Sequence, residues 1–173
     1  MTVGAAVRIG LIVFVAAILQ VSVFSSFVVG SGPDVLLLML VAIAFLRGAA
    51  TGAVIGFVAG LIVDVAVLGT LGLTSLLLTI TCYWVGRYAE TTGRGRTYAP
   101  LLATVAATNA VAIGSYALHS MLGESVAPRV VLVNLASALV WNALLAYPVL
   151  AVARRLVGAV ERHERAREVE LVV

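Results

Sequence analysis

The chain has 173 residues, of which 62% are hydrophobic and 11% are charged, and it carries a formal net charge of +3. Soluble proteins contain about 25% charged residues, so this composition excludes a water-soluble enzyme and indicates an integral membrane protein. The basic charge does not indicate nucleic-acid binding, because the arginines lie at the ends of apolar segments and in the C-terminal tail. A single cysteine and two histidines are too few for a disulfide framework or a metal cluster.

Six apolar segments are separated by short stretches that contain glycine, proline or charged residues. In chain order they are 9–29, 33–46, 48–68, 72–86, 98–121 and 128–153. The longer ones can cross a hydrocarbon core of about 30 Å. The sequence therefore predicts an all-α fold, a polytopic membrane bundle of about six transmembrane helices.

The first two segments are less regular than the others. The first follows Arg8, is longer than the apolar core of a signal peptide and has no small-residue cleavage site, so we expect it to be a retained helix. The second would extend only about 21 Å at 1.5 Å per residue. Segments two and three therefore form either two crossings or a partly re-entrant hairpin, interrupted at Arg47. We expect the leucine run from Leu36 to Leu38 to face lipid.

The arginines favour an even number of crossings with both termini in the cytoplasm, because cytoplasmic loops are enriched in basic residues. With six crossings, ten of the eleven basic residues lie on the cytoplasmic side and only Arg129 lies outside. The ten are Arg8, Arg47, Arg87, Arg94, Arg96, Arg154, Arg155, Arg162, Arg165 and Arg167. We predict one transmembrane domain over residues 1–158, followed by a short charged cytoplasmic tail over 159–173 that extends the last helix.

The third segment carries glycines at a spacing of four residues, at Gly48, Gly52, Gly56 and Gly60. Residues four apart lie nearly above one another on a helix, and the absence of side chains lets a second backbone approach closely. The stripe drifts by about 40° per step, which suits a helix that crosses its partner at an angle. We interpret the stripe as helix packing within the chain, with an interface to another protein as the alternative.

Asp64 ends this stripe, and a carboxylate in a membrane segment suggests a function such as binding a proton, a cation or an arginine of a partner. Two simpler interpretations are preferred. Asp64 lies about 24 Å along the helix from Gly48, where it would be hydrated among the outer headgroups. Alternatively, it forms a structural hydrogen bond to the loop at 69–72.

Asp34 and Arg47 are the other candidate functional polar residues. Asp34 follows Pro33 at the start of a predicted helix, where a carboxylate interacts well with exposed backbone N–H groups. Arg47 marks an inner helix end, where it acts as a topology-setting charge. Further polar residues either line a substrate cavity or form hydrogen bonds between helices. They are Gln20, Asn109, His119, Asn134 and Asn142.

The motifs of serine hydrolases, zinc metalloproteases and phosphate-binding loops do not occur in the sequence, which contains no lysine. We therefore predict no catalytic residue, no metal site and no cofactor.

Several motifs follow one another between residues 33 and 87. They are Pro33-Asp34 before a leucine-rich run, Arg47-Gly48, Gly56-Phe57-x-x-Gly60-Leu61-x-x-Asp64, Leu71-Gly72 and Gly86-Arg87. In order and spacing they resemble the MreD family of bacterial rod-shape-determining membrane proteins. The resemblance implies a non-enzymatic component of the cell-elongation machinery in the cytoplasmic membrane. It also implies pairing with the single-span protein MreC, beside MreB, RodA and a transpeptidase, to organise peptidoglycan synthesis.

The MreD family is in turn similar in fold to the substrate-binding subunits of energy-coupling-factor vitamin transporters. That similarity implies an alternative function, in which the helices hold a small ligand near the outer face. The polar residues that would then matter are Asn109, His119, Asn134 and Asp64.

Overall fold

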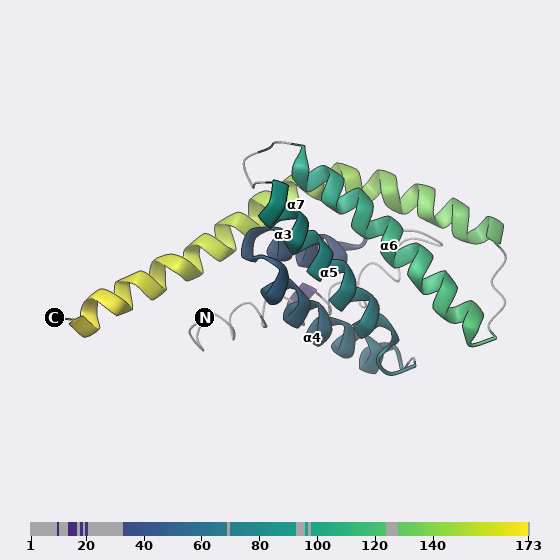
Figure 1. The fold of residues 1–173 in the computed structure, drawn as a ribbon, viewed down its shortest axis with the longest axis horizontal. Helices are drawn as coiled ribbons and strands as arrows, with labels where there is room; N and C mark the ends of the chain where they lie inside the picture. The colour runs from purple at the N-terminus through teal and green to yellow at the C-terminus, as the bar shows by residue number, and fades with distance from the viewer. Residues whose placement is uncertain are drawn as a thin grey trace.

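In the computed structural model, the described part of the chain consists of helices joined by short connections (Figure 1). The structure describes residues 33–68, 70–92, 96, 98–123 and 128–172, together with residues 10, 14–16, 18 and 20. The helices are α3 (Val35–Arg47), α4 (Ala49–Val67), α5 (Leu73–Thr92), α6 (Ala99–Met121) and α7 (Pro128–Val172). They correspond to the five segments predicted between residues 33 and 153. The helix predicted over 9–29 lies largely outside the described residues.

Three helical stretches are long and apolar enough to cross a membrane. They are Ala49–Val67, Ala99–Met121 and the part of α7 from Val131 to Leu156. The 13 residues of α3 fall short of this length. Although α5 has 20 residues, it includes several hydroxyl side chains and a charged last third with Arg87 and Glu90. The helices therefore show membrane character, while the crossing number of six stays a prediction.

The short helix α3 lies at the centre of the bundle, in contact with α4, α5, α6 and α7. The expectation that Leu36 to Leu38 face lipid is wrong, because these side chains are at most 5% exposed. The side chain of Phe45, near the other end of α3, is 0% exposed. A helix that is apolar on every face is typical of a buried position, and here longer helices surround it.

The helices α4 and α5 form a hairpin and share the most extensive helix contact in the described residues. The connection between them contains Leu68 and Gly72, both at positive φ. The helix α6 packs on α7. Beyond this contact α7 continues without a break to Val172, through most of the predicted tail, and its C-terminal part extends away from the other helices (Figure 1).

Candidate functional site

The α4–α5 hairpin contains Asp64 and three of the four glycines of the predicted stripe. Its seam consists of three glycines of α4 and the α5 residues whose backbones they approach. The pairs are Gly52 with Cys82, Gly56 with Leu78 and Gly60 with Ser75. A Cβ atom added at Gly56 would lie only 2.6 Å from the Leu78 carbonyl oxygen. The two backbones are therefore in direct contact, which is possible only because these positions have no side chain.

The fourth glycine of the stripe, Gly48, has a different role. It precedes α4 and adopts φ 97° and ψ 178°, a conformation that L side chains rarely adopt. Gly48 thus separates α3 from α4 at the position predicted from Arg47. On the opposite helix, a Cβ atom added at Gly86 would lie 2.5 Å from the backbone nitrogen of Ala49. The close contact therefore extends over the whole length of the hairpin.

Asp64 caps the first turn of α5. Its Oδ2 atom accepts hydrogen bonds from the backbone nitrogens of Gly72 at 2.8 Å and Ser75 at 3.3 Å, and its Oδ1 atom accepts one from Thr74 at 3.2 Å. The first N–H groups of a helix lack partners within that helix, and a carboxylate there also interacts with the positive end of the helix dipole. Asp64 is only 4% exposed. The structure therefore agrees with the interpretation of a structural hydrogen bond to the connecting loop, and not with a carboxylate hydrated among the outer headgroups.

Glu90 caps the hairpin at its other end. Its Oε1 atom accepts a hydrogen bond from the backbone nitrogen of Ala49 at 2.9 Å, at the start of α4. Its Oε2 atom lies 3.5 Å from Nη1 of Arg87. Each helix of the hairpin therefore supplies, near its own C-terminal end, the carboxylate that caps the start of the other helix.

Asp34 joins the start of the central helix to its neighbours. Its Oδ1 atom accepts a hydrogen bond from the backbone nitrogen of Leu37 at 2.9 Å, which is the helix-start role predicted for it. Its own backbone nitrogen donates to Oδ1 of Asn142 on α7 at 3.0 Å. The Nδ2 atom of Asn142 donates in turn to Oγ1 of Thr108 on α6 at 3.1 Å. Gln20 contributes a further acceptor, for the backbone nitrogen of Val35 at 2.9 Å.

The sequence matches the family model of the rod shape-determining protein MreD over residues 2–157. The chain belongs to the MreD family. This match confirms the resemblance seen in the motifs and makes the protein a rod-shape-determining membrane component. Comparison with curated proteins and with solved structures gave no match.

Asn109 and His119, two further polar residues of this MreD-family chain, contact carbonyl oxygens of their own helix. Asn109 donates from Nδ2 to the carbonyl oxygen of Val105 at 2.8 Å, one turn earlier in α6. The Nδ1 atom of His119 lies 2.8 Å from the carbonyl oxygen of Ser115, also one turn earlier. Within the described residues, no group of three or more histidine, cysteine, aspartate or glutamate side chains is placed to hold a metal ion.

Glu90 is the hairpin residue that the sequence analysis missed. From its position three residues after Arg87, Glu90 resembles an ordinary charged residue at the membrane surface. Such a residue does not suggest a specific role. A signal for its role nevertheless exists, because each capping carboxylate follows a closely packed glycine by four residues, as in Gly60–Asp64 and Gly86–Glu90. That spacing places the carboxylate one turn beyond the close contact, next to the start of the opposing helix.

Proposed function

We propose that this protein is a non-catalytic membrane component of the bacterial cell-elongation machinery, which pairs with an MreC-like single-span protein to organise peptidoglycan synthesis. MreB, RodA and a transpeptidase are the further components that we propose act beside it. The observation that carries the proposal is the family match over residues 2–157. The helix caps support its non-catalytic part, because the carboxylates of Asp34, Asp64 and Glu90 all accept hydrogen bonds from backbone N–H groups at helix starts.

We further propose that the chain lies in the cytoplasmic membrane, with six crossings and both termini in the cytoplasm. The distribution of arginines supports this topology, since only Arg129 of the eleven basic residues would lie outside. In this arrangement residues 1–158 form one transmembrane domain and residues 159–173 a charged cytoplasmic tail. The connection between α5 and α6, which carries Arg96, would then face the cytoplasm.

Depletion in a rod-shaped bacterial host tests this function. Cells that lose the protein are expected to become rounded, and expression of the intact chain from a plasmid is expected to restore rods. An affinity-tagged chain is expected to co-purify with a single-span protein that has a periplasmic coiled coil. Depleted cells that keep their shape and lose uptake of a vitamin would contradict the proposal and favour the transporter alternative.

A further inference from the structure

The α4–α5 hairpin has one charged end, which marks the membrane surface. At this end Ala49, the first residue of α4, lies beside Gly86 of α5. The next residue of α5, Arg87, pairs with Glu90, and their side chains are 58% and 37% exposed. Exposed charges are strongly disfavoured in hydrocarbon. The hydrocarbon core therefore begins at about the level of Ala49 and Gly86.

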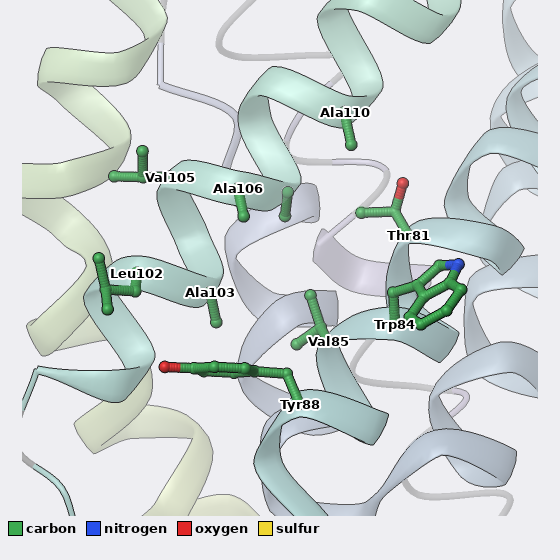
Figure 2. Close-up of a pocket in the computed structure, with 10 residues that line it drawn as sticks. Thr81, Trp84, Val85, Tyr88, Leu102, Ala103, Val105, Ala106 and Ala110 are labelled. Carbon is green, nitrogen blue, oxygen red and sulfur yellow. The ribbon is translucent and has the colours of Figure 1, made fainter. Parts of the chain in front are cut away.

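Aromatic side chains of α5 mark the same level. Trp84 and Tyr88 lie two residues before and two residues after Gly86. Both line an apolar groove of about 560 Å³ between α5 and α6 (Figure 2), and Trp84 is also among the exposed large side chains. Tryptophan and tyrosine rings favour the headgroup level of a membrane. The aromatic rings and the charges thus place the same end of the hairpin at the surface.

The other end of the hairpin lies too close to this surface to extend beyond the hydrocarbon core. The 19 residues of α4, from Ala49 to Val67, rise about 28 Å at 1.5 Å per residue. The part of α5 from Leu73 to Gly86 rises only about 20 Å. The core is about 30 Å thick, and any tilt of the hairpin shortens its reach. The start of α5 is therefore about 10 Å inside the far boundary of the core, and the end of α4 lies at that boundary.

The connection between the two helices is apolar and exposed. Leu68 is 92% exposed and Leu71 is 69% exposed, and residues 65–86 contain no charged side chain. Leu68 also adopts φ 53°, a left-handed conformation that glycine adopts more readily than leucine. Both leucines continue the apolar surface of α4, a helix that is long and apolar enough to cross a membrane. Lipid is the surroundings that such a surface matches.

Asp64 explains how α5 can begin at this depth. Hydrocarbon contains no water to bind the first N–H groups of a helix, so a partner within the protein must accept their hydrogen bonds. The buried carboxylate of Asp64 accepts them from Gly72, Thr74 and Ser75. Glu90, the corresponding cap at the charged end, is much more exposed. The buried cap therefore lies at the end of the hairpin where water is excluded.

We propose that the connection between α4 and α5 is embedded in the membrane, where Leu68 and Leu71 contact lipid acyl chains. The leaflet concerned is the one opposite the charged end, which is the outer leaflet in the topology proposed above. Both ends of the α4–α5 segment remain on one side of the membrane, so the even number of crossings is unchanged. This inference goes beyond the role proposed in cell elongation and does not depend on it.

Spin labelling of the full-length chain in lipid nanodiscs tests the proposal. A nitroxide is attached to Leu68→Cys or to Leu71→Cys, and its collisions with oxygen and with a water-soluble nickel chelate are measured by power saturation. Oxygen is concentrated in hydrocarbon and the chelate in water. We expect both labels to collide more often with oxygen. The parent chain, whose single cysteine Cys82 is buried, gives the background.

Two further labelled variants calibrate the measurement. Val58→Cys, on the exposed face of α4 and about 14 Å from the level of Ala49, is the reference for hydrocarbon. Thr91→Cys, at an exposed position beyond Arg87, is the reference for water. In bilayers with shorter acyl chains the core is thinner. Leu68→Cys is then expected to gain collisions with the chelate before Leu71→Cys does, because α4 reaches further than the start of α5.

Two results would overturn the proposal. Collisions with the chelate as frequent at Leu68→Cys and Leu71→Cys as at Thr91→Cys would place the connection in water. Few collisions with either reagent at both positions would show that protein covers the two leucines, which would make the connection a contact between copies of this chain.

Discussion

Replacing Gly56 by alanine adds one methyl group to the seam between α4 and α5, at a point where the structure leaves no space. The new Cβ atom would lie 2.6 Å from the Leu78 carbonyl oxygen, and opening this contact to an ordinary 3.4 Å separates the two backbones by about 0.8 Å. A gap of that size forfeits about a quarter to a half of the dispersion energy of the contacts involved. The loss is distributed along the seam, because both helices are rigid.

Overpacking of this kind destabilises proteins by about 1–3 kcal/mol, and the higher helix propensity of alanine offsets about 1 kcal/mol of it. We therefore expect Gly56→Ala to lower the free energy of unfolding by about 0–2 kcal/mol, and Gly56→Leu to lower it further. Titration of the full-length chain from mild detergent into sodium dodecyl sulfate, followed by tryptophan fluorescence, measures this difference.

Gly10→Ala is the matched control for this measurement. Gly10 is helical, and a Cβ atom added there would meet nothing within 4 Å. The same substitution should therefore leave stability unchanged or raise it by up to about 1 kcal/mol. If Gly56→Ala were as stable as Gly10→Ala, close backbone packing would not explain the glycine stripe.

Three further predictions concern the caps and the topology. Asp64→Asn is expected to lower the free energy of unfolding by about 1–2 kcal/mol in the same titration, because an amide offers one acceptor oxygen to three backbone N–H groups; unchanged stability with lost shape maintenance would instead show that the charge itself has a function. Asn142→Leu is expected to lower it by about 2–4 kcal/mol, since buried Thr108 and the half-buried backbone N–H of Asp34 lose their hydrogen bonds, and a fully stable variant would contradict that network. A reporter fused after Val173 is expected to be active in the cytoplasm, and activity on the outer side would overturn the even number of crossings.

The helices themselves could be predicted from the sequence, because apolar runs broken by glycine, proline and charge leave few alternatives in a membrane. The helix-start role of Asp34 was also predictable, since Pro33 and a following carboxylate are typical of that position. The burial of α3 was not predictable in the same way. Lipid and protein interior are both apolar, so hydropathy does not distinguish a leucine that faces lipid from one such as Leu38, which is 2% exposed.

The partners of polar groups were the other feature that the sequence left open. Asp64 had a hydrated and a hydrogen-bonded interpretation, and only the position of Gly72 and the first turn of α5 distinguishes them. The groove between α5 and α6 gives no sequence signal either. Alanines such as Ala106 occur throughout membrane helices, and their consequence depends on which side chains the neighbouring helix places opposite them.

The glycines of α4 face α5 and not the surface of the bundle. A loss of partner binding in a glycine variant must therefore be interpreted together with its stability. Gly56 faces α5, whereas the side chain of the next residue, Phe57, is 52% exposed on the outward side of α4. A partner protein therefore cannot contact Gly56 without separating the hairpin. We expect Gly56→Ala to reduce co-purification of a single-span partner only to the extent that it reduces stability, while Phe57→Ala keeps the unfolding free energy within about 0.5 kcal/mol of the parent chain. Loss of the partner in a Gly56→Ala variant of undiminished stability would show that the stripe meets the partner directly, contrary to the packing seen here.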